Sequence, residues 1–179
     1  MNDHQPIRLS LTILLLTLLG NFTDTSSAQR IGEQAEMVRL EKQADELSAQ
    51  SDPEGAALAI GKAAMMADIL ITKAQDSSAK NLLRAASHLN RGQELGFRAL
   101  ALFEQTGGTP PAPAGICHYL LQSNKQLNKS KNLLGKRDST FSKESQARQK
   151  SLILKHEEWG NLLRELHQEF ECETPQQEN

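Results

Sequence analysis

The chain has 179 residues, of which 23% are charged and only 4% are aromatic, and its formal net charge at pH 7 is −2. This length favours a single domain, and the scarcity of aromatic residues beside abundant Ala, Leu, Gln, Glu and Lys favours helices over β-sheet. The near-neutral charge argues against nucleic-acid binding, which needs a basic surface that displaces counterions, and against electrostatic attachment to a membrane.

An apolar segment near the N-terminus predicts that the chain is exported. Residues 9–20, LSLTILLLTLLG, directly follow Arg8, and as a helix they would span about 18 Å, well short of the ~30 Å hydrocarbon core of a bilayer. Ser26 and Ala28 provide small residues for cleavage after position 28. We therefore predict a cleaved signal peptide over residues 1–28 and a periplasmic or secreted mature chain without a membrane span; an uncleaved anchor is the alternative.

Apolar spacing predicts two helices in the first part of the mature chain. Residues 30–50 form an amphipathic pattern with a narrow apolar seam, made of Met37, Leu40, Ala44 and Leu47. Ser51 or Asp52 can cap a second helix that begins with Pro53 and extends to about residue 75. This second helix is rich in alanine, so we expect it to lie at the centre of the fold.

A third helix is expected from the capping cluster at residues 76–78 to about Gln105. Gly92 and Gly96 each cost up to ~1 kcal/mol relative to alanine inside a helix, so we expect them to mark tight packing or a bend. The sequence GGTPPAPAG at residues 107–115 cannot continue a helix and predicts a stiff linker.

The last part of the chain predicts two more helices, over residues 116–134 and about 142–171. The final helix has a sustained a/d seam at alternating spacings of four and three, which could form core or a docking surface: Leu152, His156, Trp159, Leu163, Leu166 and Phe170. Residues 174–179 are polar and predict a disordered tail.

These elements predict an all-α fold, an antiparallel bundle of four to five long helices in a single domain over residues 29–173. A short α-solenoid similar to tetratricopeptide repeats is the alternative, since Ala99, Phe103 and Pro111 lie at suitable offsets. These positions do not recur at a fixed period, and the helices are long for that architecture, so the bundle is favoured.

Both cysteines, Cys117 and Cys172, lie in the mature part of the chain. In an oxidising compartment two cysteines most simply pair. If the last two helices form an antiparallel hairpin, the first cysteine begins one helix and the second ends the other, at the same end of the bundle. Two unrelated thiols are the alternative.

The histidines on the last helix are the main candidates for chemistry. His156 lies on the apolar seam and is more simply explained as a histidine at the core edge than as a ligand. The segment HEEWG that it begins differs from the helical zinc-protease signature, because Gly160 stands where a second histidine is required. His167 and Glu171 are one helical turn apart and could share a metal ion, although such a pair is common on a solvated helix face.

A haem site is a further alternative. Met37 near the mature N-terminus and His167 near the C-terminus resemble the Met and His axial ligands of cytochrome b562-type four-helix bundles. In an up-and-down bundle of five helices, however, the start of the first helix and the end of the last lie at opposite ends, whereas both ligands must share one pocket.

The sequence contains no nucleophile elbow, no phosphate-binding glycine loop and no carboxylate pair on an apolar face. We therefore predict that the protein is not an enzyme and carries no cofactor. The expected function is interaction with another protein, or self-association, as a subunit, adaptor or scaffold of a cell-envelope or periplasmic complex. A small haem- or metal-binding carrier is the alternative.

Overall fold

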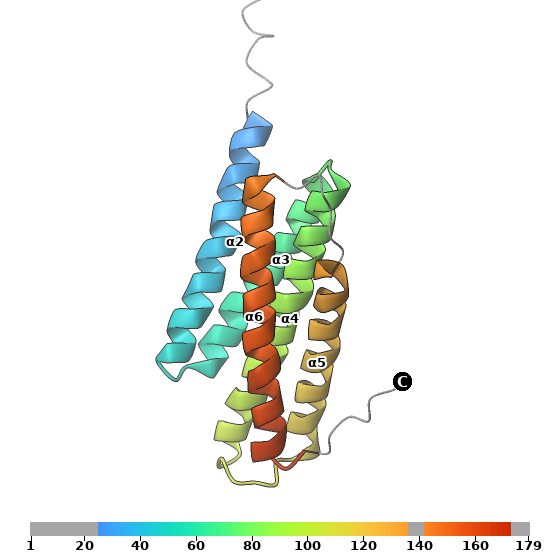
Figure 1. The fold of residues 1–179 in the computed structure, drawn as a ribbon. Helices are drawn as coiled ribbons and strands as arrows, with labels where there is room; N and C mark the ends of the chain where they lie inside the picture. The colour runs from blue at the N-terminus through green and yellow to red at the C-terminus, as the bar shows by residue number, and fades with distance from the viewer. Residues whose placement is uncertain (1–24, 136–141, 173–179) are drawn as a thin grey trace, which may run out of the picture.

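The computed structural model describes residues 25–135 and 142–172 (Figure 1). Most of the predicted signal peptide, residues 136–141 and the predicted disordered tail lie outside the described residues. The described part contains five helices and no strand: α2 (Thr25–Ala49), α3 (Pro53–Lys73), α4 (Ser77–Gln105), α5 (Ala114–Leu134) and α6 (Lys143–Glu169). The helices pack against one another, which confirms the predicted all-α bundle.

Successive helices along the chain run antiparallel and pack side by side from α2 to α5 (Figure 1). The last helix, α6, lies in front of α4, between α2 and α5. The central helix is therefore α4, which packs against α3, α5 and α6. Our expectation of a central second helix is wrong, because the alanines of α3 pack closely against α2 and α4 on one side only.

The predicted helix boundaries follow from side-chain capping. Asp52 accepts a hydrogen bond from the backbone N–H of Gly55 at 2.8 Å and so caps α3. Asp76 caps α4 through a 2.7 Å hydrogen bond from the N–H of Ala79. Each carboxylate satisfies one of the donors that the first helical turn leaves unpaired.

The end of α4 depends on glycine. Gly107 and Gly108 have positive φ angles of 102° and 61°, a conformation that glycine adopts without steric cost. The N–H of Gly108 donates to the carbonyl of Phe103 at 2.9 Å, which closes the C-terminus of the helix. The linker that follows is hydrogen-bonded to the end of α6: the N–H of Ala112 donates to the carbonyl oxygen of Phe170 at 2.9 Å.

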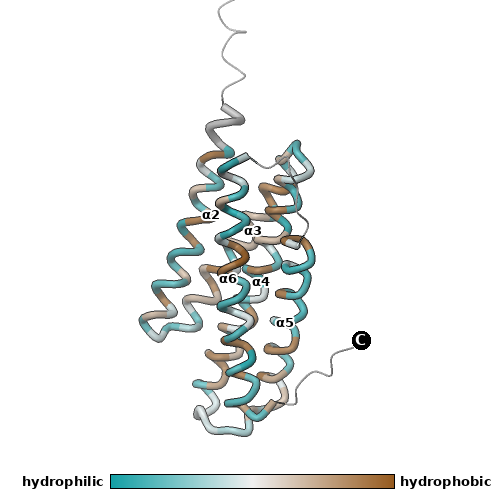
Figure 2. The backbone as a smooth tube through the Cα atoms, in the orientation of Figure 1, coloured by the Kyte–Doolittle hydropathy of each residue, from teal (hydrophilic) through white to brown (hydrophobic). Residues whose placement is uncertain are grey.

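Apolar and polar residues alternate along α6 (Figure 2). Of its predicted seam, His156 is half-buried and the other five side chains are buried: Leu152, Trp159, Leu163, Leu166 and Phe170. These five side chains complete a core to which all the other described helices also contribute.

The closest packing in this core joins α4 to α6. A Cβ atom at Gly96 would lie 2.7 Å from Cζ3 of Trp159, so only glycine leaves room for the indole ring. Phe97 packs edge-on against the same ring, with the centroids 4.8 Å apart. Gly92 also admits a close neighbour, because its Cβ would lie 3.1 Å from Leu127. Both glycines therefore mark tight packing, one of the two roles expected for them.

We expect Trp159→Ala to lower the free energy of unfolding by about 3–5 kcal/mol, because it removes a buried aromatic ring and leaves a cavity. Urea denaturation followed by circular dichroism measures the loss. Leu154→Ala on the exposed side of α6 is the control and should change stability by no more than about 0.5 kcal/mol. Equal effects of the two substitutions would show that Trp159 is not a core residue.

Candidate functional site

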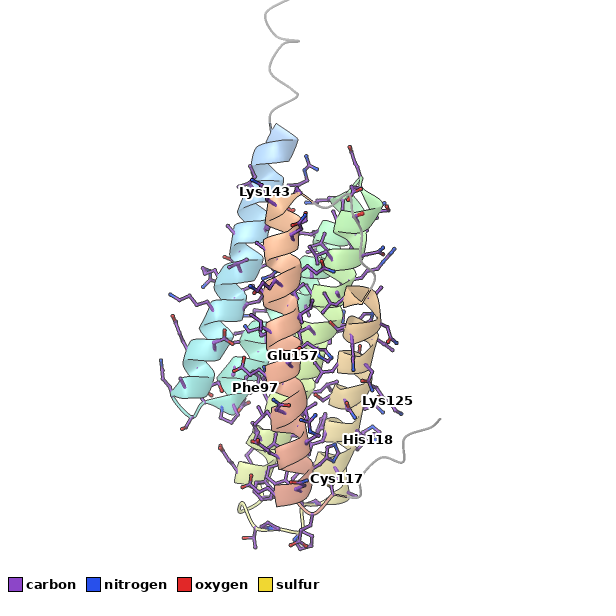
Figure 3. The ribbon with its side chains drawn as sticks, viewed as in Figure 1. Phe97, Cys117, His118, Lys125, Lys143 and Glu157 are labelled. Atoms are coloured by element: carbon purple, nitrogen blue, oxygen red, sulfur yellow. A yellow bond between two sulfur atoms is a disulfide. The ribbon has the colours of Figure 1, made fainter. Side chains whose placement is uncertain are left out.

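The two cysteines form a disulfide that joins the first turn of α5 to Cys172, three residues after the end of α6. The Cα atoms of Cys117 and Cys172 are 5.5 Å apart, and Cys117 lies beside the C-terminal end of α6 (Figure 3). The predicted pairing is confirmed. Because such bonds form and persist in oxidising compartments, the disulfide favours an oxidising environment for the folded protein.

We expect the double variant Cys117→Ser/Cys172→Ser to be less stable by about 4 kcal/mol, the chain-entropy value for a closed loop of roughly this length. Urea denaturation of the oxidised wild type, the reduced wild type and the variant measures this loss. Reductant should destabilise the wild type and leave the variant unchanged. Labelling of two free thiols in the exported protein would contradict the bond.

His167 is buried in the last turn of α6, with 6% of its surface exposed. Neither ring nitrogen finds a hydrogen-bond partner among the described residues. Burial without a compensating bond disfavours the charged imidazolium and lowers the pKa of His167. The lowered pKa favours the neutral ring, and the backbone carbonyl of His167 accepts a 3.0 Å hydrogen bond from the N–H of Cys172.

The structure does not present His167 and Glu171 on one helical face. The helix ends at Glu169, two residues earlier than predicted, and Glu171 is exposed with a positive φ of 52°. Within the described ranges no group of three or more His, Cys, Asp or Glu side chains could hold a metal ion. The metal-binding alternative therefore gains no support from the geometry.

Met37 and His167 lie far apart along the bundle. Glu41, one turn after Met37, pairs with Arg148 of α6. His167 lies 19 residues beyond Arg148 in the sequence, which corresponds to about 28 Å along the helix axis at 1.5 Å per residue. Axial ligands of one haem iron bind the same metal atom, so this pair does not form such a site in the described fold.

The buried state of His167 predicts a pH-dependent stability. Because its pKa in the folded protein lies below the ordinary value of 6.5, the unfolded chain takes up the proton first as the pH falls, and stability falls with it. We expect urea midpoints of the wild type to drop between about pH 7 and pH 5. The variant His167→Leu should show a smaller drop.

The exposed His118 on α5 provides the matched control for this experiment (Figure 3). His118→Gln should retain the pH dependence of the wild type. A pH profile of His167→Leu that coincides with those of the wild type and His118→Gln would contradict the buried, unpartnered state of His167.

His156 lies on a groove of about 380 Å³ between α5 and α6. Its Nε2 is 3.0 Å from the carbonyl oxygen of Leu127, so the neutral ring donates to this carbonyl. Burial lowers the pKa of His156, and the carbonyl bond partly opposes that effect. Lys131, Arg164 and Glu157 also line the groove. This arrangement gives His156 a structural partner and offers no activated nucleophile.

An ion-pair network joins α2 to α6. The buried carboxylate of Glu41 accepts hydrogen bonds from Arg148 at 2.7 and 2.9 Å and from Nδ2 of Asn90 at 3.1 Å. Nearby, Lys155 donates to Asp45 at 2.8 Å. Sequence reasoning missed these ion pairs, because the paired residues are 107 or more positions apart on α2 and α6 and no local pattern connects them.

The outer face of α3 carries large apolar side chains in contact with solvent. Leu58, Met65 and Ile69 are 57%, 63% and 42% exposed. Together with the exposed Lys62 and Thr72 they recur at spacings of four, three, four and three, the a/d pattern of a helix that packs against another helix. We call these five residues the α3 seam. It was not predicted, because α3 is apolar on nearly every side and its sequence does not distinguish the inner face from the outer one.

α3 is also the one described helix that is long and apolar enough to cross a membrane, a test that core helices of soluble proteins pass as well. In the structure, eight of its residues are buried within the bundle.

No protein-family model, curated protein or solved structure matches the chain.

Proposed function

We propose that this chain is an exported, non-enzymatic helical-bundle protein that acts by binding another protein molecule at the α3 seam. The observation that carries the proposal is the exposure of Leu58, Met65 and Ile69 on a single helix face. The signal-peptide pattern and the disulfide support a periplasmic or secreted location.

The α3 seam differs from the other exposed apolar residues of the described chain. α2 exposes Ile31 and Val38, and α6 exposes the neighbouring pair Ile153 and Leu154. The α3 seam extends over four helical turns with heptad spacing, which is what knobs-into-holes packing of a second helix requires. Burial of each large apolar side chain would contribute about 1.5–3 kcal/mol. A partner that covers the whole face therefore gains more binding free energy than one that covers an isolated residue.

Two sets of internal polar groups, the Glu41–Arg148 pair and His156, support a binding role over catalysis because packing explains them. Glu41 and Arg148 neutralise each other inside the bundle, and the ring of His156 is held by a backbone carbonyl. The groove beside His156 combines this ring with two cationic side chains and one carboxylate. General acid–base catalysis would instead require a donor or acceptor free to reach a substrate.

We expect a photo-reactive amino acid at position 65 to form a discrete adduct with a protein when the chain is produced in its native organism and irradiated. The same amino acid at position 154 is the control, since Leu154 is similarly exposed, at 56% against 63% for Met65. Immunoblotting and mass spectrometry identify the adduct. The absence of a protein adduct at position 65, or an identical adduct at both positions, would contradict the proposal.

A further inference from the structure

We infer that the protein bound at the α3 seam is a second copy of this chain, packed with its α3 antiparallel to the first about a two-fold axis. This inference rests on the proposed function and specifies its partner. Three features of α3 support this inference. They are the exposed residues of the α3 seam, the order of these residues along the helix, and the charges that flank them.

The order of the residues makes the α3 seam complementary to itself. A two-fold axis that passes between Ala63 and Ala64 places Leu58 opposite Ile69 of the second copy and Lys62 opposite Met65 of the second copy. These four residues then pair with one another, each a position against a d position as expected of an antiparallel pair, while Thr72 faces position 55 of the second copy. A symmetric dimer requires a surface that matches itself in this way, and the alternating spacing of four and three along the α3 seam provides it.

The single charge within the α3 seam selects the antiparallel orientation. A parallel pair would place Lys62 directly against Lys62 of the second copy, and a close like-charge pair is destabilising. In the antiparallel pair each Lys62 lies beside a methionine. Its aliphatic stem can pack on the thioether while the ammonium group extends to solvent. One polar residue within an apolar seam commonly specifies orientation in this manner.

Most charges at the borders of the α3 seam are already paired within the monomer, whereas the exposed Glu54, beside Leu58, forms no ion pair with the described residues. On the α4 side Asp68 pairs with Arg91, and Glu94 pairs with Arg98 at 2.7 Å. On the α2 side Lys73 pairs with Glu33. Two identical borders can therefore approach each other with little net repulsion, whereas a strongly charged rim would oppose self-association.

The test is the oligomeric state of the purified mature chain with its disulfide intact, measured by sedimentation equilibrium over a range of concentrations. We expect a reversible dimer for the wild type and for Leu154→Glu. Leu58→Glu should weaken the dimer by about 100-fold or more, because it replaces an apolar contact with a carboxylate twice in the symmetric interface. Circular dichroism checks that both variants keep the helical content of the wild type.

Cysteine cross-linking tests the orientation. In the antiparallel dimer a mixture of Leu58→Cys and Ile69→Cys chains should form an intermolecular disulfide under mild oxidation. Either variant alone should not, because positions 58 of the two copies are offset by about 16 Å along the helix axis. Efficient cross-linking of Leu58→Cys with itself would overturn the antiparallel arrangement.

The outcomes separate this inference from the proposed function. A wild type that remains monomeric at every concentration, while position 65 still cross-links to a different protein, would overturn the second copy and retain protein binding. A monomer that binds phosphatidylglycerol vesicles through Leu58, with no protein adduct at position 65, would overturn both.

Discussion

The contact between Gly96 of α4 and the indole ring of Trp159 is the constraint on which the rest of the structure depends. The missing side chain at position 96 lets the two helices approach closely enough for the ring to fill the space between them. This contact fixes the distance and the register between α4 and α6. The buried seam of α6 can then close a core that α2 to α5 alone would leave open on one side.

Three different interactions hold α6 along its length. Towards its N-terminus, Arg148 and Lys155 pair with acidic residues of α2. Its middle packs on α4, and its C-terminal end is tied to α5 by the disulfide. Apolar packing provides the core contact, while the ion pairs and the covalent link position the two ends. Because α6 covers α4, the outer apolar face of α3 on the other side of the bundle stays uncovered.

Periodicity within single helices was sufficient to predict much of the fold. The seam of α6 was predicted residue by residue, since burial of Leu152, Trp159 and Phe170 follows directly from their heptad spacing. The disulfide could be predicted because Cys117 begins one helix and Cys172 ends the next, so an antiparallel hairpin brings both cysteines to the same end. The capping clusters at residues 51–52 and 76–78 were evident for the same local reason, although the sequence did not single out Asp52 and Asp76 within them.

Relations between helices were not predictable from the sequence in this way. The separation of Met37 and His167 was expected from five up-and-down helices, but nothing local indicates that Glu41 meets Arg148, because this contact depends on how α2 aligns with α6. The outer face of α3 was missed for a related reason. Its Leu, Met and Ile residues have the composition of a core, and only the packed bundle reveals which of them remain in solvent.

The central claim is that α6 is an integral part of the core. Native-state hydrogen exchange of the disulfide-bonded protein, followed by mass spectrometry, tests it most directly. If α6 closes the core, the amides of residues 152–166 should exchange only with global unfolding, at the same rate as those in the middle of α4. Rapid exchange throughout this part of α6, while α4 stays protected, would show that α2 to α5 form a stable unit without it.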